Sequence, residues 1–361
     1  MSCKDCPLSC PTDTPATIVK NNFVFKSLCN FSLNLFIGCL HACRFCYVTD
    51  TSIKRIVKLL RSHGIKDPVK DWGKYLLVRL WHRQKFMASL KKAEETPVDE
   101  LKPDGNRAVM LCTTTDAYQV IRNTDPETRK KLQQHADYVR RESLRLIQSE
   151  SSLNVRILTR SPMARKDFDI FKTFGDRLLL GTSLPTLDPK LAKVYEPKVS
   201  APKHRLKLLL DARKHGINTF VAVAPVFPEC DYDGLVELFS EVKRADPVTI
   251  FMEPVNLRLD IARRIEEEAA KVGYTIDMEP YTNRVAWADY AIGKLRDAER
   301  AAEEAGVADR LHLWPDKALG SKKVVERQPD PEAYRAWLDK WWNRISEWPG
   351  TPAQQIVKPK A

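Results

Sequence analysis

The sequence predicts an α/β fold built on a parallel sheet. Short apolar runs alternate along the chain with longer stretches of helical periodicity, and glycines stand just after two of those stretches, at Gly216 and Gly273. Such alternation is typical of parallel sheets with right-handed crossovers. Six strand–helix units fit either an open doubly wound sheet or an incomplete barrel. In both architectures functional groups gather at the carboxyl ends of the strands.

Each unit follows from its own pattern. Short apolar runs bounded by turn residues predict buried strands, and a glycine suits the position after a helix because it adopts positive φ without strain. Strands are expected over residues 33–37, 108–112, 155–159, 178–183, 219–224 and 248–252. Helices are expected over residues 126–149, 164–173, 202–215, 234–244 and 260–272.

Three segments surround or interrupt the core of residues 31–275. Residues 1–30 form a Cys-rich extension, and residues 51–107 form an insertion with fourteen Lys and Arg against seven Asp and Glu. Within the insertion we expect a strand over 75–80 and a helix over 84–95.

Residues 276–361 hold six of the eight tryptophans and are expected to be helical. Their aromatic face is expected to pack on the sheet, and a stacking surface for bases is the alternative. The face consists of Tyr334, Trp337, Leu338, Trp341, Ile345 and Trp348.

Composition narrows the class of protein. The 361 residues are 43% apolar and 29% charged, which excludes a disordered or low-complexity chain. No run of about 18 apolar residues is present, which excludes a membrane-spanning helix. The N-terminus lacks the pattern of a secretory signal, so a cytoplasmic location is expected. The net charge of +12 permits a polyanionic partner without requiring one.

The cysteines indicate a metal. Seven of nine lie within the first 46 residues, and a reducing compartment favours metal ligation over disulfides. Cys39, Cys43 and Cys46 place three thiolates on one loop directly after an apolar run. Their donor set fits a 4Fe–4S cluster with one open iron. It also fits zinc, with His41 or a distant residue as fourth ligand.

The spacing C-x3-C-x2-C, with Phe45 before the third cysteine, resembles the signature of the radical S-adenosylmethionine (SAM) superfamily. Residues 34–47 resemble the branch that includes spore photoproduct lyase and the DNA-repair-photolyase-like proteins, with Phe36 and Phe45 replacing two tyrosines. The resemblance spans about residues 31–270. Its further motifs, in order, are Thr115–Gln119, Leu158–Pro162, Tyr195–Pro197 followed by Arg205, and Ala224–Pro228.

The resemblance implies a partial (β/α)6 barrel of the TIM type and a cluster held by Cys39, Cys43 and Cys46. It also implies that one electron cleaves SAM to a 5′-deoxyadenosyl radical, which abstracts hydrogen from substrate. The cofactor-binding residues implied are Phe45, Tyr47, Thr113, Thr114, Asp116, Ser183, Glu196, Arg205, Val223 and Ala224. For several of these a purely structural role is the alternative, such as Thr113 and Thr114 satisfying backbone groups at a strand end.

The leading hypothesis for function is radical SAM chemistry on a nucleic acid or nucleotide, as a lyase, repair or modifying enzyme. Trp72 and Trp81 among the cations of the insertion are typical of single-strand binding. Alternatives are the same chemistry on a small molecule or peptide, and a non-catalytic zinc or Fe–S protein that binds a polyanion. An electron donor such as flavodoxin or ferredoxin is the expected partner.

The remaining cysteines suggest two further roles. Cys3, Cys6, Cys10 and Cys29 could hold a second metal, either an Fe–S cluster or zinc, and unligated thiols are the alternative. Cys112, at a strand end, is a candidate hydrogen donor to a product radical, and core packing is the alternative. Glu253 and Asn256 follow the sixth strand, where a substrate would approach.

Overall fold

A computed structural model describes residues 8–21, 28–256 and 259–345 of the chain. Its strands form an eight-stranded sheet in the order β11-β10-β9-β8-β7-β6-β3-β2 and a three-stranded sheet in the order β1-β5-β4. The strands are β1 (Leu8–Pro15), β2 (Ile18–Lys20), β3 (Phe31–Leu33), β4 (Phe36–Ile37), β5 (Tyr75–Leu80), β6 (Ala108–Leu111), β7 (Asn154–Thr159), β8 (Leu178–Ser183), β9 (Asn218–Val226), β10 (Ile250–Pro254) and β11 (Leu311–Leu313).

The helices follow the strands along the chain. Within the described ranges, none combines the length and the apolar character that a membrane crossing needs. The α-helices are α1 (Ser52–Arg55), α2 (Val57–Ser62), α3 (Arg83–Glu94), α4 (Pro126–Glu150), α5 (Phe168–Thr173), α6 (Pro189–Tyr195), α7 (Pro202–Lys214), α8 (Tyr232–Lys243), α9 (Leu259–Val272), α10 (Arg284–Glu304), α11 (Lys322–Val325) and α12 (Pro331–Trp342).

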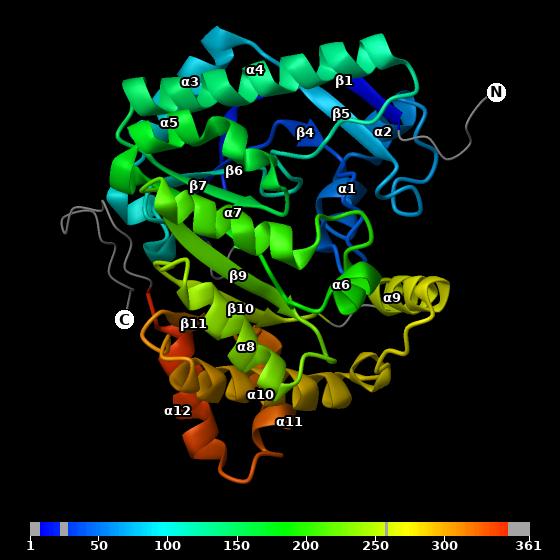
Figure 1. The fold of residues 1–361 in the computed structure, drawn as a ribbon, viewed down its shortest axis with the longest axis vertical. Helices are drawn as coiled ribbons and strands as arrows, with labels where there is room; N and C mark the ends of the chain where they lie inside the picture. Colours follow the sequence, from blue (N-terminus) through cyan, green and yellow to red (C-terminus); the bar gives the residue numbers. More distant parts are fainter. Residues whose placement is uncertain (1–7, 22–27, 257–258, 346–361) are drawn as a thin grey trace.

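The order of strands decides between the two predicted architectures. From β3 through β6 to β11 the strands lie side by side in chain order and all pair in parallel. A doubly wound sheet would reverse direction at a switch point, but here every crossover runs the same way. The helices α4, α5, α7 and α8 accordingly cover one face of the strands (Figure 1). The fold is therefore a partial barrel, as predicted.

The barrel buries different side chains on its two faces. The outward face packs against the helices in two large apolar clusters, one over β3 to β8 and one over β9 to β11. The inward face holds a smaller apolar cluster, which includes Met110, Leu179, Phe220 and Phe251 from four different strands. Alternate residues of a strand point to opposite faces, so this inward cluster identifies which side chains enter the barrel.

The predicted first strand, residues 33–37, is two strands in the structure. β3 pairs in parallel with β6 in the large sheet, whereas β4 pairs with β5 in the small one. The break falls at Asn34, whose side-chain carbonyl accepts hydrogen bonds from the backbone and hydroxyl of Thr114. Continuous apolar periodicity concealed the point at which the chain leaves one sheet for the other.

The extension and the insertion form one structural unit. β1, from the extension, pairs in parallel with β5, which is the strand predicted over residues 75–80. Ile53, Leu60 and Trp72 of the insertion then pack on Cys39 of the cysteine loop. Trp72 is only 6% exposed, so it is unavailable for stacking on a base.

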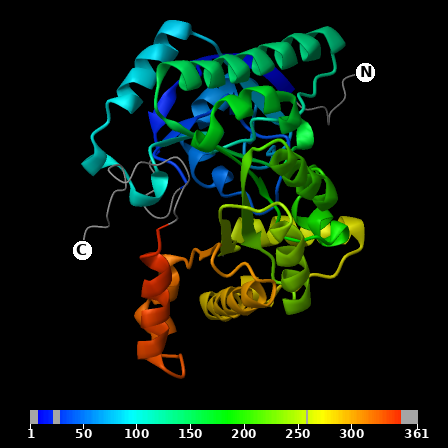
Figure 2. The ribbon, with the colours of Figure 1, turned by 60° about the vertical axis from the view of Figure 1, so that its left-hand side comes forward.

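The C-terminal region contributes a strand as well as helices. β11 pairs in parallel with β10 and extends the barrel by a seventh parallel strand, which the sequence pattern did not predict because it is three residues long. Trp337 and Trp341 of α12 are buried and donate their indole N–H groups to Glu299 of α10. Figure 2 shows α12 in red at the lower end of the molecule. Tyr334, Trp337, Leu338 and Trp341 are buried in one apolar cluster with residues of β9 to β11, so the predicted packing role is confirmed for these four, with α10 as a direct partner. Ile345 is half-buried beyond the end of α12, and Trp348 lies outside the described residues.

Close packing inside the barrel yields a stability prediction. A Cβ at Gly181 of β8 would overlap the buried ring of Phe220 on the neighbouring strand. We expect Gly181→Ala to lower stability by about 1–3 kcal/mol, since overpacking strains a filled core. Gly293→Ala in α10 is the matched control, because no atom lies within 4 Å of its added methyl. Thermal unfolding of both variants checks this, and an unchanged midpoint for Gly181→Ala would show that the interior is loosely packed.

Candidate functional site

The cysteine loop lies between β4 and the short 3-10 helix at Tyr47–Thr49. Cys39 and Cys43 are buried and Cys46 is half-buried. The loop begins at Gly38, which has φ +89°, and a Cβ there would lie 2.6 Å from the Tyr75 ring. Only glycine satisfies both conditions, so this residue sets the path of the loop.

The segment after β6 holds the cysteine loop in place. The Thr115 hydroxyl donates to the Gly38 carbonyl at 2.6 Å, and the Leu40 amide donates to Gln119 Oε1 at 2.7 Å. His41 Nδ1 lies 3.5 Å from Asp116 Oδ2. The T-D-A-Y-Q motif therefore supports the cysteine loop through three of its five side chains.

Asp116 is the centre of this support. It is 4% exposed, and its carboxylate accepts hydrogen bonds from the amides of Tyr118 and Arg160 and from the hydroxyl of Thr159, each at 2.8 Å. These partners come from the ends of β6 and β7. Because they occupy the carboxylate, its position is explained without a cofactor, and the predicted contact to SAM stays a prediction.

Thr113 and Thr114, like Asp116, form hydrogen bonds with neighbouring segments at the end of β6. The Thr113 carbonyl accepts from the Tyr47 hydroxyl at 3.0 Å, and the Thr113 hydroxyl accepts from Asn34 at 3.4 Å. Thr114 donates to the same asparagine. Both threonines are half-buried at the carboxyl edge of the barrel. They hold the loop on which Tyr47 lies and still reach solvent.

A buried charge network joins the ends of β7, β8 and the loop after α6. Arg160 donates to Glu196 at 2.6 Å and to the Ser183 hydroxyl at 2.8 Å. Arg205 lies 2.6 Å from Glu196 in an ionic contact whose angle falls outside that of a hydrogen bond, and it donates to the Ser183 carbonyl at 2.6 Å. Three of the predicted cofactor residues are thus brought together by Arg160.

Arg160 was not among the predicted site residues. Its guanidinium lies 5.5 Å from the centre of the Phe45 ring, and its charge lowers the pKa of the Cys43 thiol, which burial raises. It therefore links the charge network to the cysteine loop. The signal in the sequence was the Thr159-Arg160-Ser161 motif at a strand end, but its partner Glu196 is distant along the chain.

The apolar side chains divide into two groups. Phe45 packs on Phe227, with ring centres 5.8 Å apart, and remains half-exposed. Ala224 is half-exposed on the inward side of β9, and its carbonyl accepts from the Ser183 hydroxyl at 2.9 Å. Val223 is fully buried in the helix-side cluster. Strand alternation thus turns Val223 away from the barrel interior, so it is not in position to contact a base there.

The three thiols fit an iron–sulfur cluster. Burial raises the pKa of all three, that of Cys43 to about 12, and the charge of Cys43 raises that of Cys39 further. Among the described residues no three His, Cys, Asp or Glu side chains already form a metal site. His41 faces Asp116, so the donors that the loop itself offers are its three thiols. That donor set suits a cluster with an open iron better than a structural zinc.

The hypothesis of a second metal site receives no support from the described residues. Cys10, on β1, packs beside the cysteine loop, whereas Cys29 packs inside the barrel with Met110. These two thiols belong to different clusters because the extension crosses from the small sheet to the barrel interior. Cys3 and Cys6 lie outside the described residues.

Cys112 lies on the helix side of the sheet. Its φ of +61° interrupts the alternation of β6, and its sulfur, 4% exposed, accepts from the Leu35 amide at 3.5 Å. It belongs to the same apolar cluster as the inner face of α4. Packing accounts for this position, and the hydrogen-donor role stays a prediction.

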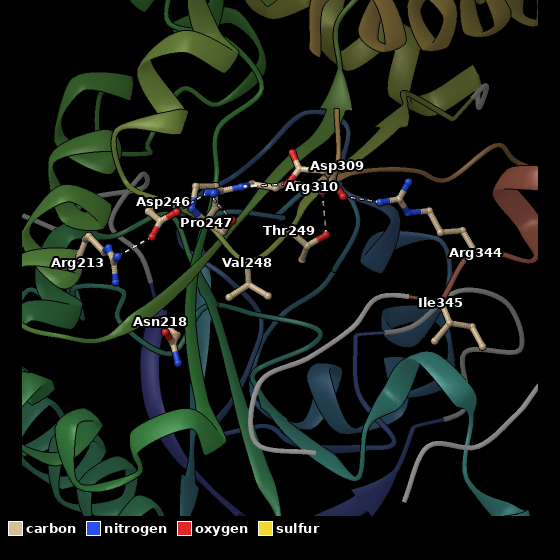
Figure 3. Close-up of a pocket in the computed structure, with 10 residues that line it drawn as sticks. All are labelled: Arg213, Asn218, Asp246, Pro247, Val248, Thr249, Asp309, Arg310, Arg344 and Ile345. Carbon is tan, nitrogen blue, oxygen red and sulfur yellow. Dashed lines mark hydrogen bonds and ion pairs between the residues drawn. The ribbon is translucent and has the colours of Figure 1, made fainter. Parts of the chain in front are cut away.

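A cavity of about 620 Å³ lies at the opposite edge of the barrel, before β9, β10 and β11 (Figure 3). Its Arg213 and Arg310 both pair with Asp246 at 2.5 Å. The two arginines thus share one carboxylate, and none of the predicted site residues lines the cavity. The candidate site is the carboxyl edge, where the cysteine loop lies.

The charge network yields a prediction for stability and its pH dependence. Burial alone would raise the pKa of Glu196, but Arg205 and Arg160 outweigh it and hold that pKa below its ordinary value. Glu196 therefore contributes stability above the unfolded carboxyl pKa of about 4.3, and loses it as pH falls further. We expect Glu196→Gln to cost about 3–5 kcal/mol at neutral pH, since two buried arginines lose their partner.

Denaturant unfolding between pH 3 and pH 7 measures this effect, and the variant should lose less stability on acidification than the wild type. Glu326→Gln is the control, because its carboxylate is 59% exposed and pairs only loosely with Lys322. Equal stability of Glu196→Gln and wild type at neutral pH would contradict the assignment of Glu196 as the buried partner of both arginines.

Sequence comparisons find relatives without assigning a function. No protein-family model matches the chain. An uncharacterized protein of Acidianus two-tailed virus is 32% identical over 213 residues, which are 59% of this chain and 61% of the viral protein. The match therefore spans less than two thirds of that relative. An uncharacterized protein of Methanocaldococcus jannaschii is 22% identical over 261 residues, covering 72% of this chain and 82% of that protein.

Comparison with solved structures identifies the fold. A spore photoproduct lyase variant aligns with a TM-score of 0.57 at 15% identity, covering 85% of this chain and 82% of the other. A second variant, with bound S-adenosylmethionine and dinucleoside spore photoproduct, aligns with a TM-score of 0.53 at 16% identity over 81% and 80% of the two chains. The chain therefore has the fold of spore photoproduct lyase, the radical SAM partial barrel that its sequence predicted.

Proposed function

We propose that the protein is a radical SAM enzyme that abstracts hydrogen from a nucleic-acid or nucleotide substrate. The observation that carries this proposal is the three-thiol loop, buried and held by the end of β6 at the carboxyl edge of the barrel. When bound at Cys39, Cys43 and Cys46, a 4Fe–4S cluster supplies the electron that cleaves SAM to methionine and a 5′-deoxyadenosyl radical. The protein then has to bind and orient SAM and the substrate, and to exclude water from the site.

The chain's own residues suit those tasks. The Phe45 ring and the half-exposed Ala224 offer apolar surface beside the loop for an adenine. Ser183 and the Arg160–Glu196 pair offer polar groups to ribose and to the amino-acid end of SAM. Since these groups are already bonded to one another, the site is largely formed before a ligand enters, which lowers the entropy cost of binding.

The substrate class is supported by charge. The net charge of +12 favours a polyanion, and exposed Lys54, Arg55, Lys58 and Arg61 lie on α1 and α2 beside the cysteine loop. Phosphate contacts of this kind make binding strongly dependent on salt. Affinity for single-stranded DNA that ignores ionic strength would count against a nucleic-acid substrate.

Iron content and SAM cleavage test the proposed chemistry. We expect anaerobically reconstituted wild type to hold about four irons per chain, as a single cubane requires, and to release 5′-deoxyadenosine with SAM and dithionite. Cys39→Ser, Cys43→Ser and Cys46→Ser should each lose most of the iron and all of the release. Cys230→Ser, a buried thiol near α8 outside the site, is the control. Zinc at the loop, or intact SAM after reduction, would refute the proposal.

We also propose that an acidic redox protein, such as a flavodoxin or ferredoxin, docks on a cationic face formed by Arg44, Lys74, Arg122 and Lys198. Lys198 donates to the Gly73 carbonyl at 3.1 Å, and Gly73 packs directly on Ala42 of the cysteine loop. Burial lowers the pKa of Lys198, and Arg122, Arg44 and Lys74 lower it further, whereas Glu268, which pairs with Arg44 at 2.5 Å, raises it. Lys74, Arg122 and Lys198 are exposed, so the face keeps positive charge beside the loop.

Charge reversal tests this docking face. Lys74→Glu and Lys198→Glu together should slow 5′-deoxyadenosine release with a reduced flavodoxin by roughly tenfold at low salt, because electrostatic steering is lost. The rate with dithionite should stay unchanged, since a small reductant needs no docking surface. Lys322→Glu on α11, which is 84% exposed at its side chain, is the control. Equal slowing with both reductants would show damage to the site instead.

A further inference from the structure

The inward face of β10 and β11 carries a row of side chains that the proposed function has not used. Phe251 and His312 are register partners on the two strands, with ring centres 5.5 Å apart. The Trp314 amide donates to the Met252 carbonyl at 2.8 Å and extends the ladder, and its ring lies 4.6 Å from that of Phe251. Glu253 follows Phe251 by two residues, so it lies on the same inward face, beside Trp314.

This part of the face reaches solvent at the same edge as the cysteine loop. Glu253 and Trp314 are half-exposed, whereas Met252 and Leu313, which point outward, are fully buried. Glu253 lies at the carboxyl end of β10, and Trp314 directly follows β11. Both therefore lie at the carboxyl edge of the barrel, where the cysteine loop also lies.

Glu253 is half-exposed, and its carboxyl group takes part in no hydrogen bond or ion pair with the described residues. Burial together with nearby Asp316 raises its pKa to about 7. Within the described part of the chain, Asp316 accepts a hydrogen bond from the Ala318 amide at 2.8 Å. Trp314 Nε1 is buried without an acceptor in the described part of the chain. Polar groups left in this state commonly serve a ligand.

We propose that Glu253 and Trp314 form a subsite for a nucleobase-like ring, a planar nitrogen heterocycle that presents N–H donors to Glu253 and stacks against the Trp314 indole. The pair of acids repels phosphate, so the subsite takes the base and leaves the backbone to the cations outside the barrel. A carboxyl group accepts from the exocyclic amine of cytosine, adenine or guanine. An indole face stacks on any base.

This subsite rests on the proposed function, because that function places the substrate at this edge of the barrel. It makes Glu253 and Trp314 specificity-determining residues that contact the substrate base, and it requires no step of the radical chemistry. Binding can therefore be measured on the reconstituted full chain without SAM or reductant, independently of turnover.

Fluorescence anisotropy with two labelled strands tests the subsite. One probe is a short single-stranded oligodeoxycytidine, and the other is an abasic strand of the same length and charge. We expect wild type to prefer the cytidine strand by roughly tenfold, the value of one stacked and hydrogen-bonded base. The ratio of the two affinities cancels the change in overall charge that a substitution introduces.

Variants then assign the preference to the two residues. Glu253→Gln and Trp314→Leu should each bring the ratio close to one, Trp314→Phe should keep most of it, and the control Glu326→Gln should keep all of it. Thermal unfolding checks that each variant is folded. If Trp314→Leu does not fold, Glu253→Gln, which preserves the shape of the side chain, is sufficient for the test. Equal wild-type affinity for both strands, or an unchanged ratio in Glu253→Gln, would overturn the subsite.

The two proposals fail in different experiments. A base preference without 5′-deoxyadenosine release under reducing conditions would refute the radical chemistry and leave the subsite standing. Release without any base preference would leave the chemistry standing and refute the subsite.

Discussion

The arrangement of the site depends on one buried carboxylate. Asp116 accepts hydrogen bonds from its own turn and from the end of the neighbouring strand, and it faces His41 inside the cysteine loop. A carboxylate that is 4% exposed is stable only when its oxygen atoms accept hydrogen bonds, so Asp116 fixes the positions of the groups that donate to it. Two strand ends and the loop are thereby held in one register, and the path of the three thiols follows from it.

A second set of buried charges extends this edge. Glu196 lies between Arg160 and Arg205, and both arginines are anchored to β8 through Ser183. Buried ion pairs add little net stability compared with apolar packing, but they are costly to break and they define orientation. The polar side chains at this edge are thus held in fixed positions. The apolar core beneath them, which joins strands to helices, supplies the stability that this arrangement requires.

The N-terminal extension and the insertion of residues 51–107 bury the cysteine loop, which would otherwise be exposed. β1 and β5 form a small sheet whose apolar residues, with those of α1 and α2, cover the cysteine loop from outside. Burial raises the pKa of the thiols and shields a bound group from solvent and oxidants. Cations of the same segment, such as Lys54, Arg55, Lys58 and Arg61, stay on the surface, so the segment that covers the loop also carries exposed positive charge.

The sequence alone determined features that depend on neighbours a few residues apart. These are the three cysteines on one loop and five of the seven parallel strands, β6 to β10, whereas the strand expected over residues 33–37 overlaps β3 at one residue only. Tertiary structure decided the rest. Arg160 finds Glu196 across 36 positions, and β11 is too short to be recognised before it pairs with β10. The strand pattern could not show that Val223 faces the helices, nor that a positive φ turns Cys112 outward. Side-chain direction at a strand end depends on how the chain leaves the sheet, and only long-range packing sets that path.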